Sequence, residues 1–295
     1  MHFRSIEKSD RELFASAVGE KTYLACEYRF AHLFLWKDSD GIRIASDGTD
    51  LFFKESRVGC FMAPVSDDPV RALDKLAAHC QETGDRFLVC SGYQELADAL
   101  EGNPVYRVEH DRTYDDYVYR ASDLIDLPGK AYHGKRGHIA KFSRTHCYSF
   151  APYTDADRKA CMQLEEEWVE HHGFTHTTLA EQQAIETALT HLDFLGMSGG
   201  CLRVNGKLAA FTVGQRADRQ MGIVHFEKCA PGMEEAYPVI NQAYAAMAFE
   251  GLTYINRQDD MGLPGLRRAK EQYHPVTMAK KYTITLREDE PPRQE

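Results

Sequence analysis

Residues 255–275 read INRQDDMGLPGLRRAKEQYHP, and this stretch decides how the second half of the chain is interpreted. A short apolar strand runs directly into polar and charged side chains at residues 256–260, and the turn-forming residues 262–265 then introduce a cationic helix. Polar groups at the end of a buried strand cost free energy unless each finds a partner, and ligand sites in open α/β sheets lie at strand ends. We therefore expect a strand-to-helix junction that carries a ligand site.

The composition is that of a globular protein. The chain has 295 residues, of which 43% are hydrophobic and 27% charged, enough for two domains of about 150 residues each. No apolar run approaches the roughly 18 residues needed to span a bilayer, and the N-terminus MHFRSIEKSD lacks the apolar core of a secretion signal. The eight cysteines form no C-x-x-C pair and are expected to be reduced thiols. These features predict a cytoplasmic protein without a structural zinc site.

Charge is distributed unevenly along the chain. The net charge is −10, from 35 lysines and arginines against 45 acidic residues, and a surface of that sign disfavours DNA as a partner. Between Asp126 and Asp155, however, there is no acidic residue. We predict that four residues of this basic segment bind an RNA backbone or an anionic substrate, namely Lys135, Arg136, His138 and Lys141. The structural alternative is a solvated linker that pairs with the acidic bulk of the protein.

The order of expected elements restarts after residues 127–129. In the first half, apolar periodicity and turn residues predict helices at 10–18, 30–36, 69–82 and 94–100 and strands at 41–45, 49–54, 59–63 and 86–90. A strand, a turn and a second strand are expected over 106–119. In the second half they predict helices at 130–144, 155–172, 179–195, 237–249 and 265–272 and strands at 148–153, 200–204, 208–214, 221–228, 253–256 and 277–286. We therefore expect an α/β (α+β) protein with two domains, 1–128 and 129–295. The residues after Arg287 have the composition of a disordered segment.

This element order is similar to that of acyltransferases of the Gcn5-related N-acetyltransferase (GNAT) type, and the first half is a degraded version of it. Two segments carry a more specific resemblance: DYVYRASDLIDLPGKAYHGKRGHIAKF at 116–142 and the stretch at 255–275. They resemble a bacterial family of uncharacterised proteins that is itself similar to the C-terminal domain of phosphatidylglycerol lysyltransferase. The resemblance implies two tandem GNAT-like domains with mixed, mostly antiparallel sheets, joined by the basic segment.

The resemblance also implies kinship with enzymes that move an aminoacyl group from aminoacyl-tRNA to an amine or hydroxyl. The sequence departs from the family at Gly137, which stands where the basic motif usually carries a polar side chain. It also lacks the transmembrane helices with which lipid-modifying members hold their product. We therefore expect a soluble acceptor rather than a lipid.

Acetyl-CoA-binding GNAT proteins cradle the pyrophosphate in a Gly-rich loop at a helix N-terminus. The corresponding loop here, CAPGMEEAYP at residues 229–238, has one glycine, two prolines and two acids that would repel phosphate. We therefore expect an aminoacyl donor rather than acyl-CoA. Acyl-CoA is the alternative donor, and the sequence suggests no other cofactor.

Acyl transfer to an amine needs a base to take the proton and donors to stabilise the oxyanion. The candidate bases are Glu227, Asp259 and Asp260, and the candidate proton donors to the leaving group are Tyr273 and Tyr282. The structural alternative for Glu227 is an ion pair with Arg257 or Lys228.

Substrate binding is expected at the same junction. Arg257 can clamp a carboxylate or phosphate, and Asp259 or Asp260 can hold an ammonium group. The remaining binding candidates in this cleft are Asn241, Asn256 and Lys270. The structural alternative is a self-satisfied network that fixes the turn into the next helix. Glu167 and His171 lie one helical turn apart, but their spacing indicates no third ligand, so we expect no metal.

The sequence thus predicts an acyltransferase that moves an aminoacyl group to a soluble amine or hydroxyl, with a small molecule or aminoacyl-tRNA as substrate. Two alternatives remain. One is an N-acyltransferase that uses acyl-CoA in the N-terminal domain. The other is a non-catalytic sensor that binds an amino acid or another anion in the same cleft. Neither the acceptor nor the oligomeric state follows from the sequence.

Overall fold

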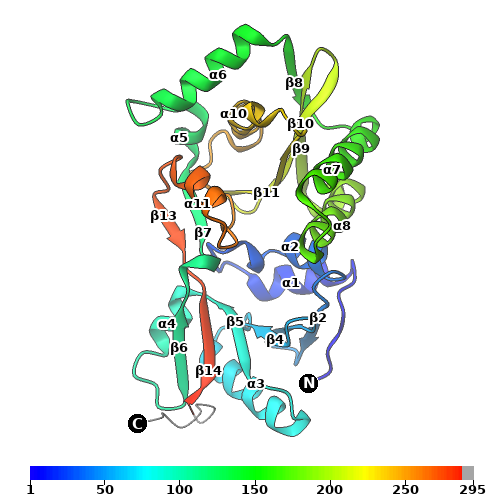
Figure 1. Cartoon of the computed structure of the whole chain (residues 1–295). Helices are drawn as coiled ribbons and strands as arrows, with labels where there is room; N and C mark the ends of the chain where they lie inside the picture. Colours follow the sequence, from blue (N-terminus) through cyan, green and yellow to red (C-terminus); the bar gives the residue numbers. More distant parts are fainter. Residues whose placement is uncertain (288–295) are drawn as a thin grey trace. The chain divides into compact units, whose positions relative to one another are not determined.

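The computed structural model describes residues 1–287, so the tail predicted to be disordered, residues 288–295, lies outside it. The described residues form two compact units, each built on its own seven-stranded mixed sheet (Figure 1). The first unit comprises residues 1–116, 259–262 and the described residues from 279 on. The second comprises residues 117–258 and 263–278. No helix among residues 1–287 has the length and apolar character needed to cross a membrane.

The sheet of the first unit has the strand order β1-β2-β3-β4-β5-β14-β6, in which β4 and β5 run parallel. Its strands are β1 (Arg4–Ser5), β2 (Ile42–Ser46), β3 (Leu51–Glu55), β4 (Cys60–Met62), β5 (Leu88–Gly92), β6 (Tyr106–His110) and β14 (Tyr282–Leu286). Its helices are α1 (Asp10–Val18), α2 (Phe30–Trp36), α3 (Pro69–Thr83) and α4 (Gln94–Ala99). The longest, α3, begins where the Asp68 side chain accepts from the Arg71 N–H, and ends at Gly84 in the left-handed conformation.

The sheet of the second unit has the order β13-β7-β12-β11-β10-β9-β8. Its strands are β7 (Asp116–Arg120), β8 (Tyr148–Pro152), β9 (Met197–Val204), β10 (Lys207–Arg216), β11 (Met221–Cys229), β12 (Tyr254–Asn256) and β13 (Thr277–Ala279). Its helices are α5 (Ala121–Asp126), α6 (His133–Thr145), α7 (Arg158–His172), α8 (His176–Thr190), α9 (Leu192–Leu195), α10 (Tyr237–Phe249) and α11 (Pro264–Glu271). This order of strands and helices is that of a GNAT domain.

Two helices cover opposite faces of the second sheet. Helix α7 packs on β10 and β11, and α10 packs on β9, β10 and β11. Successive side chains of a strand point to opposite faces, and in β11 Glu227 meets Asn241 of α10 whereas Lys228 meets Glu165 of α7. The face under α10 is filled by an apolar cluster that includes Tyr244 and Phe249. This packing holds α10 against the strands that carry the candidate site.

Strands β11 and β12 run parallel and then part. They pair from Met221 opposite Tyr254 to Ile223 opposite Asn256, where β12 ends. Strand β11 continues to Cys229 along β10, and its register with β10 skips one residue, His225. Such a bulge bends a strand and changes where its side chains point, and bulges are enriched beside active sites. The parting of the two strands therefore leaves the ends of β11 and β12 free to present side chains toward a common space.

The predicted strands and helices are confirmed in type and order, with two corrections. The strand expected at 277–286 is two strands, β13 and β14, which belong to different sheets. The interruption falls at Lys281, whose N–H donates to the Asp115 carboxylate (3.0 Å) and whose ammonium is buried among acids. The helix expected at 179–195 is two helices, α8 and α9. The strand, turn and strand expected at 106–119 are confirmed as β6 and β7, which lie in different sheets.

The compact units also divide the chain differently from the expected ranges 1–128 and 129–295. Strand β7 and helix α5 precede residue 128 but pack in the second unit, and β14 lies between β5 and β6 of the first. Long-range strand pairing produces this exchange, and no local pattern in the sequence signals it. The assignment of one acetyltransferase-like domain to each of the two expected ranges stays a prediction.

Candidate active site

A buried ion pair spans the place where β11 and β12 part. Arg257 Nη2 lies 2.9 Å from Glu227 Oε1, and Asn241 of α10 donates from Nδ2 to Glu227 Oε2 at 3.1 Å. The side chains of Glu227 and Arg257 are only 9% and 13% exposed. Burial alone would lower the pKa of Arg257, but the facing Glu227 carboxylate raises it, so the guanidinium stays charged. The structural alternative named for Glu227, a pair with Arg257, is therefore present.

Aromatic rings and a second cation surround this pair. The Arg257 guanidinium lies 4.9 Å from the centre of the Tyr273 ring and 5.9 Å from that of Tyr119. Lys135 Nζ lies 4.0 Å from the Tyr273 ring centre and donates to Gln272 Oε1 at 3.2 Å. Burial and the nearby Arg257 charge lower the pKa of Lys135, whereas burial raises the pKa of Tyr273. The structure thus brings Glu227, Arg257, Asn241, Tyr273 and Lys135 together.

Asn256 and Lys270 support the turn after β12. Asn256 is fully buried, and its Oδ1 accepts from the Gln258 N–H at 2.6 Å. Lys270 reaches back from α11 to donate to the carbonyls of Arg257 (2.6 Å) and Gln258 (3.1 Å). Gln258 itself has a φ of 59°, a backbone conformation that is uncommon for residues other than glycine. Both side chains therefore hold the strand end in the shape that presents Arg257.

Three predicted catalytic residues belong to the other compact unit. The carboxylates of Asp259 and Asp260 each accept from a backbone N–H two residues further on, of Met261 (3.0 Å) and Gly262 (2.9 Å). The Tyr282 hydroxyl donates to Gln94 Oε1 at 2.6 Å. For the two aspartates these contacts match the structural alternative of a network that fixes the turn.

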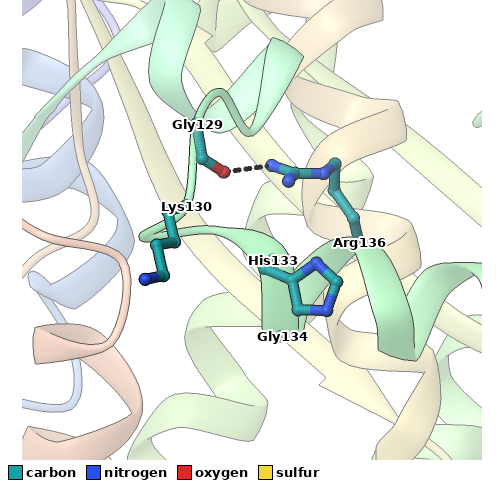
Figure 2. A pocket seen from close by; sticks show the side chains of 5 residues that line it. All are labelled: Gly129, Lys130, His133, Gly134 and Arg136. Atoms are coloured by element: carbon teal, nitrogen blue, oxygen red, sulfur yellow. Dashed lines mark hydrogen bonds between the residues drawn. The ribbon is translucent and has the colours of Figure 1, made fainter.

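Helix α6 carries the basic segment, and its side chains diverge. Lys135 faces the Tyr273 ring, whereas His138 and Lys141 are exposed. Arg136 donates to the carbonyls of Leu127 and Gly129 (2.8 Å to the latter), and these hydrogen bonds hold the loop before the helix. A hollow of about 610 Å³ lies there, lined by Gly129, Lys130, His133, Gly134 and Arg136 (Figure 2). The segment therefore offers one inward-facing lysine and an exposed basic surface.

Sequence reasoning missed a buried cluster beneath β11. Lys228 is 3% exposed, and its ammonium lies 2.6 Å from Glu181, 3.7 Å from Glu165 and 3.3 Å from the Trp168 ring centre. Glu165 is fully buried, and burial raises its pKa to about 7. A lysine near the end of a long apolar strand was the available signal, because a buried lysine needs a paired acid.

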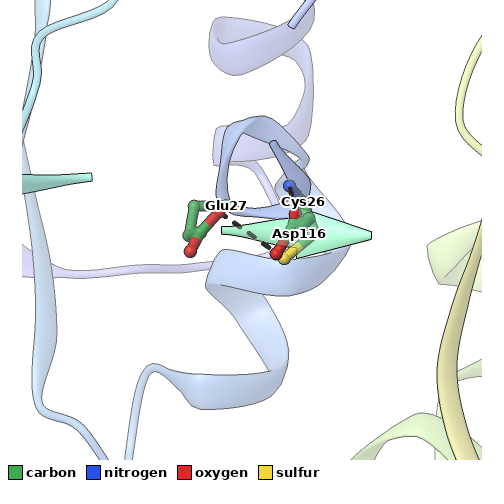
Figure 3. Close-up of side chains that lie close together, drawn as sticks. All are labelled: Cys26, Glu27 and Asp116. Carbon is green, nitrogen blue, oxygen red and sulfur yellow. Dashed lines mark hydrogen bonds between the residues drawn. The ribbon is translucent and has the colours of Figure 1, made fainter. Parts of the chain in front are cut away.

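A second missed cluster lies in the first unit, where Cys26, Glu27 and Asp116 are close together (Figure 3). Thiol and carboxylate groups at this spacing could coordinate a cation. Lys281 Nζ, however, lies 2.5 Å from Glu27 Oε1 and 2.7 Å from Asp116 Oδ1. Although burial favours the neutral amine, these carboxylates raise the pKa of Lys281 well above its ordinary value. The lysine thus supplies the positive charge that a metal would bring, so the cluster is an internal ion-pair network.

The two mixed seven-stranded sheets with their covering helices define a protein with a GNAT-like fold. Residues 22–285 match the family described as "Phosphatidylglycerol lysyltransferase, C-terminal". The chain therefore belongs to the phosphatidylglycerol lysyltransferase C-terminal family. A search of curated proteins finds no match. Membership of the family supports an acyl- or aminoacyltransferase in general.

Solved structures resemble the chain over nearly its whole length. A conserved protein of unknown function from Bacteroides thetaiotaomicron VPI-5482 is 32% identical, with a TM-score of 0.90, and the match covers 97% of this chain and 99% of that one. The structure of L-PGS from Bacillus licheniformis is 17% identical, with a TM-score of 0.68 and coverage of 96% and 93%. FemX is 10% identical, with a TM-score of 0.60 and coverage of 97% of both chains. The two more distant structures show a common fold.

Proposed function

We propose that the second unit transfers an aminoacyl group from an aminoacyl-tRNA-type donor to a soluble amine or hydroxyl acceptor. The observation that carries the proposal is the buried Glu227–Arg257 pair, held by Asn241 where β11 and β12 part. A carboxylate and a guanidinium fixed side by side supply the two functions that acyl transfer needs, a proton acceptor and a donor to the oxyanion. Membership of the lysyltransferase C-terminal family supports the same class of reaction.

The loop at residues 229–238 favours this donor over acyl-CoA. The Gly232 N–H, which a pyrophosphate would need, donates to Glu234 Oε1 at 2.9 Å. Hydrogen bonds from the backbone N–H groups of Glu234 itself and of Gly232 lower the pKa of the Glu234 carboxyl, so this group stays charged. Glu235 pairs with His146 at 2.6 Å. A loop with two acids, one of which occupies the Gly232 backbone donor, repels phosphate, so it is a poor pyrophosphate cradle.

The proposed reaction uses three side chains. The acceptor N–H or O–H attacks the acyl carbon and gives its proton to Glu227, while Arg257 donates to the carbonyl oxygen as it becomes negative. The ester C–O bond then breaks, and the leaving 3′ oxygen takes a proton from Tyr273, whose raised pKa keeps its hydroxyl protonated. We assign no chemical step to Asp259, Asp260 or Tyr282, because their described contacts hold turns and strands.

The basic helix α6 suits the nucleic-acid part of such a donor. His138 and Lys141 are exposed and can contact phosphates. Arg136 can add the N–H donors that do not bind the carbonyls of Leu127 and Gly129. Lys135 lies closer to the reacting groups, beside Tyr273. We propose that α6 positions the donor's 3′ end near Glu227 through phosphate contacts, which carry no sequence information of their own.

The test is transfer of a radiolabelled aminoacyl group from aminoacyl-tRNA to a panel of amines, hydroxyl compounds and phosphatidylglycerol vesicles. Arg257→Ala and Glu227→Gln should each lower the rate at least tenfold, because each removes a group that contacts the reacting atoms. Arg203→Ala is the matched control, since it breaks an Arg–Asp ion pair on β9 of the same unit. Consumption of acyl-CoA unaffected by Arg257→Ala would refute the aminoacyl donor, and donor binding without turnover would indicate a sensor.

A further inference from the structure

Two polar atoms at the candidate active site are buried without a partner. Within residues 1–287, neither Arg257 Nη1 nor Asn241 Oδ1 has a hydrogen-bond partner, and both are shielded from water. Asn241 as a whole is 2% exposed. Buried polar groups in folded proteins are nearly always hydrogen-bonded, and each one left unsatisfied costs about 1–3 kcal/mol. Two such atoms, on residues that both contact the Glu227 carboxylate, therefore indicate a place prepared for a ligand.

The two atoms belong to groups that grip the same carboxylate. Arg257 contacts Glu227 Oε1 through Nη2, and Asn241 contacts Glu227 Oε2 through Nδ2. Each residue thus uses one end of its polar group on Glu227 and leaves the other end unused. The unused end of Arg257 is an N–H donor, and that of Asn241 is a carbonyl acceptor. A complementary ligand must present an acceptor and an N–H or O–H donor close together.

An α-aminoacyl group has this pattern, because its carbonyl oxygen and its amino nitrogen are attached to adjacent carbons. A simple acyl group has the carbonyl oxygen but no neighbouring donor. The amino nitrogen is an N–H donor whether or not it is protonated. A free α-amino group has a pKa of about 8, so its neutral form is accessible near that pH.

We infer that Asn241 is a specificity-determining residue that selects donors with a free α-amino group, through a hydrogen bond from that group to Oδ1. Arg257 Nη1 meanwhile donates to the acyl carbonyl oxygen. The inference rests on the aminoacyl transfer proposed above. It adds that the Asn241 side chain distinguishes an aminoacyl donor from a simple acyl donor. Asn241 lies on α10, whose packing on the sheet fixes its position relative to Glu227.

The experiment compares stable donor analogues. The probes are 3′-deoxyadenosines that carry an alanyl, lysyl or glutamyl group in amide linkage at a 3′-amino group, together with counterparts that lack only the α-amino group. Dissociation constants are measured by calorimetry. Wild-type protein should bind at least one aminoacyl probe about tenfold or more tightly than its counterpart, since a buried site rejects a ligand that leaves its acceptor unpaired.

Asn241→Leu should abolish this preference, because leucine has a similar size but no acceptor. Gln242→Leu is the matched control on the same helix: it removes a side-chain hydrogen bond, to the Ile125 carbonyl (2.8 Å), and should keep the preference. Asn241→Ala removes the same acceptor with a smaller side chain and should also lose the preference, which tests the inference if Asn241→Leu does not fold.

The outcomes separate the two proposals. Equal binding of both members of every pair, lost in Arg257→Ala, would leave acyl transfer standing and overturn the role of Asn241. A preference for the α-amino group that persists in folded Asn241→Leu would overturn it as well. Binding of CoA in place of all the nucleoside probes, or binding of none of them, would overturn the aminoacyl donor and this inference with it.

Discussion

Replacement of Glu165 by glutamine should make the protein more stable at alkaline pH than the native chain. Glu165 lies on α7, fully buried, and within residues 1–287 neither of its carboxylate oxygens accepts a hydrogen bond. Its nearest cation is the Lys228 ammonium at 3.7 Å, which is itself bound at 2.6 Å to Glu181. Burial therefore dominates and raises the pKa of Glu165 from 4.5 to about 7.

The sign and size of the effect follow from this shift. A carboxyl group whose pKa is higher in the folded state holds its proton longer there than in the unfolded chain. The stabilisation of the folded state by protonated Glu165 is therefore fully present below pH 4.5 and is lost as the pH rises through about 7. With about 1.4 kcal/mol for each unit of pKa, a shift of roughly 2.5 units costs the native protein ~3 kcal/mol at alkaline pH. Glutamine is neutral at every pH and escapes this cost.

The assay is urea unfolding of Glu165→Gln and its parent at several values between pH 5 and pH 8.5. Trp168 reports on this region, because the Lys228 ammonium lies 3.3 Å from its ring centre, and Trp36→Phe removes the other tryptophan from both proteins. The difference in unfolding free energy should grow by about 2–3 kcal/mol in favour of glutamine over this range. Glu170→Gln, at an exposed position of the same helix, should show no such trend. A difference independent of pH would refute the reasoning.

Three further results are expected. Lys281→Met should lower thermal stability by about 3–5 kcal/mol, because it leaves buried carboxylates without their cation, and an unchanged melting temperature would contradict the proposed ion-pair network. Gly222→Ala should lower the free energy of unfolding in urea by about 1–3 kcal/mol, because the added Cβ would lie 2.5 Å from the Phe249 ring. Gly134→Ala in α6 is the control: its Cβ meets no atom within 4 Å, and it should raise the free energy of unfolding by about 0.5–1 kcal/mol. Lys141→Ala should weaken tRNA binding and reduce the slope of log K against log salt by about 0.7–0.9; a salt-independent affinity would exclude phosphate contact.

Local patterns in the sequence determined the elements and their order. Apolar residues at helical or alternating spacing predicted α3, α7, α10 and the β9–β10 hairpin, because side-chain periodicity depends on neighbours within one element. The absence of acids between Asp126 and Asp155 likewise indicated a distinct basic segment, which is α6. The stretch at 255–275 indicated a strand-to-helix junction, because Gly, Pro and polar residues favour a turn at their own position in the chain.

Tertiary structure alone decided which of the polar residues meet. Glu227 joins Asn241, 14 residues on, and Arg257, 30 residues on, through the packing of α10 and the parallel pairing of β11 with β12. Asp259 follows Arg257 by two residues yet packs in the other compact unit, and Lys281 pairs with Glu27 and Asp116, both more than a hundred residues away. Strand pairing and helix packing bring these residues together although they are far apart in the sequence. Contacts between distant residues produce no periodic pattern of residue types, so the sequence does not reveal them.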